Sequence, residues 1–60
     1  SETTFGPNPD AAHNRGLCHY SLGELDQSLN AFETALRVAP GFGPSREGRI
    51  RVLRELPTTE

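Results

Sequence analysis

The chain has 60 residues, six basic and eight acidic side chains, a formal charge of −2, one cysteine and 33% hydrophobic residues. A chain this short buries only a modest share of its surface, so it can form one small domain at most, and an enclosed active site would be hard to build. The slight acidity argues against a nucleic-acid partner, one cysteine excludes an internal disulfide, and no apolar run suits a signal peptide or a membrane span, so a cytoplasmic protein without membrane contact is the default expectation.

The first local signal is a helix start at residues 8–10, Asn-Pro-Asp. Residues 1–8 are polar and turn-rich apart from Phe5, and we expect them to be a flexible lead-in. Asparagine is a favourable N-cap, proline suits the first helical position, and an acidic residue suits the positive helix end. These signals predict a helix over about residues 9–22, which Gly23 ends in the left-handed conformation.

A second helix is predicted from about Glu24 to Val38, where Pro40 and a following glycine end it. Its apolar residues recur at spacings of three and four, the pattern of a helix with one buried face. They are Leu25, Leu29, Phe32, Ala35 and Leu36. Glu33 and Arg37 are expected to form an ion pair on the outer face.

A third helix is predicted over about residues 43–56, stopped by Pro57, with residues 57–60 as a tail. Its inward-facing apolar stripe is expected to consist of Ile50, Leu53 and Leu56. Its other side is charged and is expected to hold two ion pairs four residues apart, Glu47 with Arg51 and Arg51 with Glu55. No alternation typical of strands persists, so the sequence predicts an all-α protein: an antiparallel helical hairpin with a third helix packed on it.

The spacing of residues 9–42 resembles a tetratricopeptide repeat, a 34-residue helix–turn–helix unit. The residues that carry the resemblance are Gly16, Gly23, Phe32, Ala35 and Pro40, which fall on the family's close-approach, turn, aromatic, alanine and proline positions. The departures are Ala12, Arg15, His19 and Ser28, which replace the family's usual Trp, Leu, Tyr and second Ala. We expect the Arg15 stem to lie along the hairpin with its head in water. Residues 43–56 then resemble a capping helix in the place of the next repeat's first helix.

Cys18, His19 and His13 raise the possibility of a metal or nucleophile site. Adjacent helix residues point about 100° apart, so these three side chains do not converge, and a metal site usually needs three or four ligands. We therefore expect Cys18 to be half-buried and His19 to fill a core position. The chain also lacks a nucleophile elbow and a phosphate-binding loop, so no catalytic residue, metal or cofactor is expected.

The resemblance implies a non-catalytic protein–protein interaction module, a scaffold or adaptor that binds a peptide or partner protein on a concave face. Carried over by position, that face consists of Asp10, His13, Leu17, Tyr20 and Ser21 on the first helix and Glu47, Arg51 and Arg54 on the third. Because His13 and Leu17 stand where some members hold a C-terminal carboxylate with Lys and Asn, that ligand is not expected. Arg51 and Arg54 would hold an acidic peptide, unless glutamates on their own helix neutralise them.

Two other functions stay open at this point. About three repeats are normally needed to bury a continuous core, so one repeat leaves apolar ends uncovered. The chain would then be a small structural subunit that forms homo-oligomers through its exposed hairpin surfaces. Alternatively, it is an accessory domain excised from a larger protein.

Overall fold

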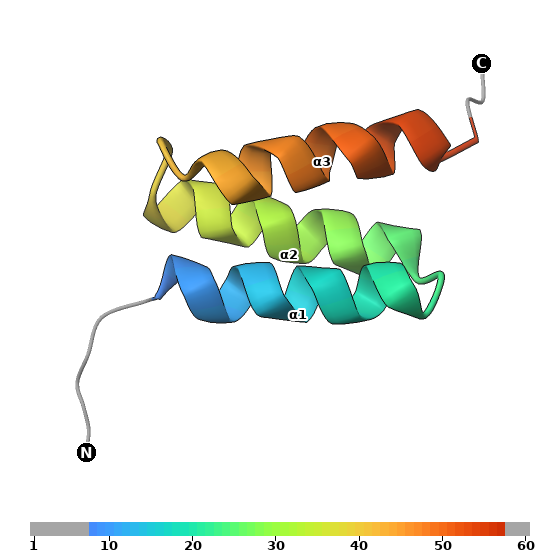
Figure 1. The fold of residues 1–60 in the computed structure, drawn as a ribbon, viewed down its shortest axis with the longest axis horizontal. Coiled ribbons are helices and arrows are strands. Elements are labelled where there is room, and N and C mark those ends of the chain that lie inside the picture. Colours follow the sequence, from blue (N-terminus) through green and yellow to red (C-terminus); the bar gives the residue numbers. More distant parts are fainter. Residues whose placement is uncertain (1–7, 58–60) are drawn as a thin grey trace.

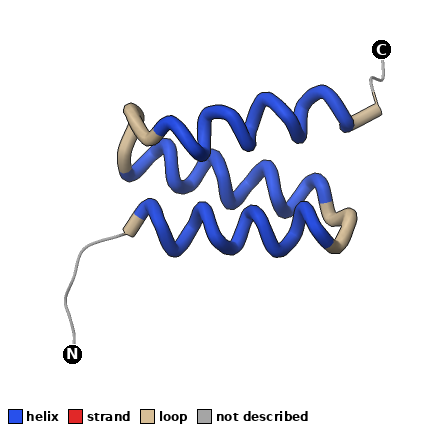
Figure 2. The backbone as a smooth tube through the Cα atoms, viewed as in Figure 1, coloured by secondary structure: helices blue, strands red, loops and turns tan. Residues whose placement is uncertain are grey.

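The computed structural model describes residues 8–57 and contains three helices, α1 (Pro9–Ser21), α2 (Leu25–Val38) and α3 (Gly43–Glu55). The helices lie side by side with α2 between the other two (Figure 1). The two connecting loops lie at opposite ends (Figure 2), so α1 and α3 run in one direction and α2 in the other. The all-α hairpin with a third helix is confirmed. The expected lead-in, including Phe5, and the expected tail lie almost entirely outside the described residues.

Both ends of α1 form as the sequence predicts. The Asn8 side chain accepts a hydrogen bond of 2.8 Å from an amide in the first turn of α1. At the other end Gly23 has a φ of +80°, which an L side chain rarely adopts. The amides of Gly23 and Glu24 donate to the carbonyls of Tyr20 and His19 at 3.0 and 2.8 Å, the two bonds of a Schellman motif. The chain therefore reverses within three residues.

Phe32 of α2 lies at the centre of the molecule and is 1% exposed. A β-carbon added at Gly16 of α1 would lie 2.6 Å from its ring, and one added at Gly48 of α3 would lie 2.7 Å from it. Both distances are too short for a real contact, so the ring packs directly against the backbone of both neighbouring helices. The close-approach role expected of Gly16 is confirmed, and Gly48 has the same role on α3.

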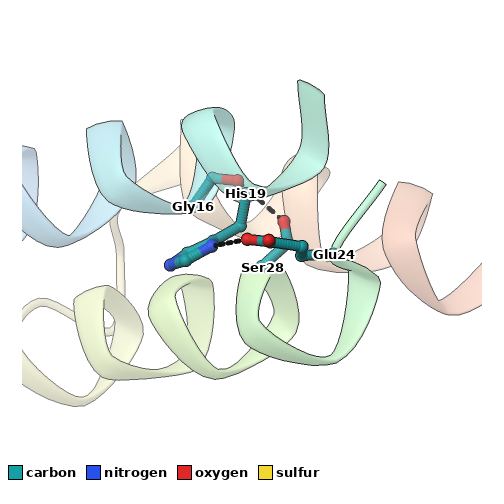
Figure 3. Close-up of polar contacts among 4 residues, drawn as sticks. All are labelled: Gly16, His19, Glu24 and Ser28. Carbon is teal, nitrogen blue, oxygen red and sulfur yellow. Dashed lines mark hydrogen bonds and ion pairs between the residues drawn. The ribbon is translucent and has the colours of Figure 1, made fainter. Parts of the chain in front are cut away.

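Ser28 of α2, where the family usually has alanine, is fully buried and keeps its hydroxyl bonded. Its Oγ donates to the Gly16 carbonyl at 2.8 Å (Figure 3), so the buried polar atom has a partner. Beside it, His19 Nδ1 lies 2.6 Å from Glu24 Oε1 (Figure 3). The His19 side chain is 27% exposed. His19 is therefore a partly exposed partner of Glu24, and the core position expected for it is wrong.

The inward-facing stripe expected on α3 is wrong. The residues that α3 buries are Ser45 and Val52, both 0% exposed, with Gly48 between them against Phe32. Ile50 and Leu53 are 49% and 45% exposed. The apolar pattern predicted the helix but not which of its sides meets α2, because α3 has small residues where the Phe32 ring fills the space.

Contacts between helices replace two of the expected ion pairs within helices. Glu33 of α2 pairs with Arg49 of α3, with Nε and Oε2 3.5 Å apart, and not with Arg37. Glu55 of α3 accepts a hydrogen bond from Tyr20 of α1 and does not pair with Arg51. Each acidic group thus joins two helices: Glu33 joins the consecutive helices α2 and α3, and Glu55 joins α1 and α3. Within residues 8–57 no helix is long and apolar enough to cross a membrane.

Candidate functional site

The residues expected on the binding face lie on α1 and α3, and most are open to solvent. The exposed ones are Asp10, Leu17, Ser21, Glu47, Arg51 and Arg54, while His13 and Tyr20 are half-buried. We use the term α1–α3 face for the surface that carries Leu17, Tyr20, Ser21, Glu47, Arg51 and Arg54. Side-chain contacts hold the two helices together along this face.

His13 belongs to the packing between helices. Its Nδ1 lies 3.0 Å from the Oγ of Ser45, at the start of α3. Its ring centroid lies 5.4 Å from that of Phe32 and 5.6 Å from that of Phe42, in a tilted and an edge-on arrangement. Such aromatic pairs and a bonded nitrogen commit most of the ring to the fold. His13 therefore links α1 to α3 and offers a ligand little surface.

Tyr20 forms a second link near the other end of the same two helices. Its hydroxyl donates a hydrogen bond to Oε2 of Glu55. The hydrogen bond to this carboxylate raises the pKa of Tyr20 above 10.0, with smaller contributions from burial and from the charge of Glu55, while Arg51 acts in the opposite direction. Glu55 was missing from the site expected from sequence, because only the packing of the helices brings these residues together.

Leu17 and Arg51 lie between the two links. Leu17 precedes Tyr20 by three residues and Arg51 precedes Glu55 by four, so each lies one turn before the linked residue, on the same side of its helix. Leu17 is 47% exposed. Arg51 is also exposed, so each helix has an exposed side chain one turn before the Tyr20–Glu55 link, aliphatic on α1 and a guanidinium group on α3.

A shallow hollow of about 200 Å³ lies on α3 at the edge of this face. It is lined by Glu47, Ile50, Arg51 and Arg54, of which three were expected site residues and Ile50 was expected to point inward. Sites for small molecules usually measure about 300–1,000 Å³ and are more enclosed. The hollow is therefore better matched to one side chain of a partner than to a cofactor.

The Cys-His cluster of α1 does not form a site. Cys18 is exposed, so its expected half-buried state is wrong, because the side of α1 that carries it has no described helix against it. Over residues 8–57, no three His, Cys, Asp or Glu side chains gather closely enough to hold a metal ion.

The fold and this surface define a class: a helical hairpin extended by a third helix, with polar and aliphatic side chains presented on two parallel helices. The sequence profile of the tetratricopeptide repeat matches residues 9–42, more than half of the chain, and the chain belongs to this family. Repeats of this kind generally mediate protein–protein interactions. Neither a curated protein nor a solved structure matches the chain.

Proposed function

We propose that the chain is a non-catalytic protein–protein interaction module that binds a peptide or a segment of a partner protein on the α1–α3 face. The observation that carries this proposal is that Leu17 and Arg51 are exposed, and that in sequence each lies between its helix's residues in the His13–Ser45 and Tyr20–Glu55 links. Leu17 offers apolar contact area, and Arg51 and Arg54 offer charge-assisted hydrogen bonds to backbone or side-chain oxygens.

The two links favour binding by preorganisation. Each ties α1 to α3 by a side-chain hydrogen bond, at opposite ends of the stretch that carries Leu17. A surface held in place before binding loses less conformational freedom when the partner arrives, so more of the contact energy appears as affinity. The links thus support a role for this face as a fixed platform for a ligand.

The burial of Ser45 supports a non-catalytic role. Its Oγ and Nδ1 of His13 have the separation of a nucleophile and its base, 3.0 Å. Ser45 is 0% exposed, however, so a substrate has no access to its oxygen. This pair is explained by the packing of α3 onto α1.

A display library of short random peptides, selected against the intact chain, tests the proposal. Selected peptides should bind in fluorescence anisotropy, and Leu17→Ser should weaken that binding about tenfold, because it removes most of an exposed aliphatic contact. Leu22→Ser is the matched control, since Leu22 is 71% exposed at the end of α1 and is outside the face. Failure to enrich any peptide, or equal losses in both variants, would count against the proposal.

Self-association is the second candidate function. It is favoured by large apolar side chains that stay exposed within residues 8–57, namely Leu17, Leu22, Ile50 and Leu53. Uncovered apolar side chains on a small domain are typical of surfaces that meet another chain. Light scattering after size exclusion should then show a mass that rises with concentration, whereas a constant monomer mass would rule this function out.

A further inference from the structure

One side of α3 carries an apolar pair that no other described element covers. Ile50 is two residues from both Gly48 and Val52, which places it on the opposite side of the helix from the face that meets α2. Leu53 follows one turn later, and the two are 49% and 45% exposed. We call this surface the outer α3 face and define it by Arg46, Arg49, Ile50, Leu53 and Arg54.

The outer α3 face is basic in an acidic chain. The segment Gly43–Glu55 holds four of the six arginines and only two of the eight acidic residues. Of those two acids, Glu55 is engaged by Tyr20, and the first turn of α3 carries no acidic residue or side-chain cap that would offset the positive helix end. Only Arg49 on this face has an acidic partner among the described residues, Glu33. Glu47, the other acid, is exposed and lines the hollow beside Ile50, so it offsets part of the positive charge. The arginines outnumber it, so the charge around the apolar pair is net positive.

The register of α3 argues against a neighbour that packs as α2 packs on α1. Both bounds of α3 lie 34 residues after those of α1, so Ile50 takes the place that Gly16 has in α1. At Gly16 even a β-carbon would lie 2.6 Å from the Phe32 ring. A complete isoleucine side chain at this position would hold a helix with an aromatic residue farther from α3 than α2 lies from α1. A partner must therefore pack its own side chains against the Ile50 side chain.

Charge argues against a second copy of the same face. Two outer α3 faces packed together would bring the arginines of both chains into proximity, and like charges across an interface disfavour association. A partner with carboxylates beside its apolar residues has the opposite effect, because it neutralises the arginines while covering Ile50 and Leu53.

We propose that the outer α3 face binds an acidic amphipathic helix of a partner protein. Leucine-like residues of that helix cover Ile50 and Leu53, and Asp or Glu residues beside them pair with Arg46 and Arg54. One apolar side chain fits the hollow of about 200 Å³ that Ile50 lines. The hollow is shared with the α1–α3 face through Glu47, Arg51 and Arg54, so the two sites adjoin there. Ile50 and Leu53 belong only to the outer α3 face, and this site does not require a ligand on Leu17.

The test uses two synthetic amphipathic helical peptides that share the same leucines and differ only in flanking residues, Glu in one and Gln in the other. Fluorescence anisotropy with the intact chain should show the Glu peptide binding about tenfold more tightly, with the difference shrinking at high salt. Ile50→Ser should weaken the Glu peptide about tenfold, and Arg46→Gln should weaken it while reducing its salt dependence. Circular dichroism checks that both variants keep their helices.

Leu17→Ser separates this site from the α1–α3 face. It should leave binding of the Glu peptide unchanged, whereas a loss with Leu17→Ser and none with Ile50→Ser would place the peptide on the α1–α3 face and overturn the proposal. Equal affinity for the Glu and Gln peptides, or binding of neither, would also overturn it. A concentration-dependent dimer that Ile50→Ser dissociates would overturn it in favour of a second copy as the occupant.

Discussion

Phe32 determines which residues fit at two positions far apart in sequence. Its ring lies against the backbone of Gly16 on one side and Gly48 on the other. Glycine inside a helix is unfavourable by about 1 kcal/mol relative to alanine, so local propensity alone favours replacing both. The ring reverses that preference, because a β-carbon at either position would overlap it.

Gly48→Ala should therefore destabilise the protein although alanine is the better helix former. Overpacking a filled core costs roughly 1–3 kcal/mol, which exceeds the gain in helix propensity of about 1 kcal/mol. The expected result is a lower free energy of unfolding in urea denaturation followed by circular dichroism.

Gly43→Ala is the matched control for this prediction. Gly43 also lies in α3, at its first residue, but a β-carbon there would have nothing within 4 Å. It should be neutral or stabilising. If Gly48→Ala stabilised the protein as much as Gly43→Ala, the central packing of Phe32 would be wrong.

At the scale of the helices, the face of α3 that meets α2 can be tested by comparing two apolar residues. Val52→Ala should lower the free energy of unfolding by roughly 2 kcal/mol, because it removes two buried methyl groups from a side chain that is 0% exposed. Ile50→Ala should change it by less than about 0.5 kcal/mol, as is usual for exposed positions. Similar losses for both, measured by urea denaturation, would contradict the observed register.

The link between α1 and α3 can be followed through the chain's one tyrosine. Titration at the absorbance of tyrosinate should give a pKa of Tyr20 above 10.0, because the hydrogen bond to the Glu55 carboxylate is lost when the phenol ionises. Glu55→Gln should bring the pKa back towards 10.0. Glu47→Gln, on the same helix, should leave the pKa of Tyr20 unchanged. If Glu55→Gln did not lower this pKa, the link would be contradicted.

The raised pKa of Tyr20 also predicts how the free energy of unfolding changes at high pH. The unfolded chain loses the phenol proton first, so from about pH 10 upward the folded state binds more protons than the unfolded state. The contribution of the link to the free energy of unfolding is therefore complete below pH 10 and falls as pH rises through the raised pKa. Thermal melts of the wild type and Glu55→Gln should converge across this range.

In the molecule as a whole, we expect the hairpin to depend on α3 for its stability. Gly48 of α3 lies against the Phe32 ring, and α3 also buries Val52. A chain shortened to residues 1–42 should therefore lose most of its helical signal in circular dichroism, because isolated short helices are marginal in water. A chain shortened to residues 1–57 retains every described helix and should keep the signal. A folded 1–42 chain would contradict this role of α3.

The helices α1 and α3 show how far the repeat pattern extends beyond residues 9–42. Helices α1 and α3 have the same length and an offset of 34 residues, but exposure is reversed at two matching positions. Gly16 is buried, whereas its counterpart Ile50 is exposed; Cys18 is exposed, whereas its counterpart Val52 is buried. Position in the repeat therefore does not by itself determine burial, since each helix is covered only on the side where α2 lies.

Local chemistry was sufficient for the sequence to determine the helices and the first turn. The Asn8 cap, the stop at Gly23, and the spacing of Phe32 and Ala35 act within a few residues, and the structure confirms each of them. The family followed from the same spacing. These local conformations depend on residues nearby in the chain, so they can be predicted without knowing the fold.

The tertiary structure alone determines which side of α3 meets α2. It also determines which partners the charged and ring side chains have. Ile50 and Leu53 have the spacing of a buried stripe, but the Phe32 ring lies against Gly48, and α3 buries Ser45 and Val52 instead. Tyr20 and Glu55 are 35 residues apart, and His13 and Ser45 are 32 apart. Such pairs form because α2 brings α1 and α3 into parallel contact, and the same geometry leaves Leu17 and Arg51 exposed between them.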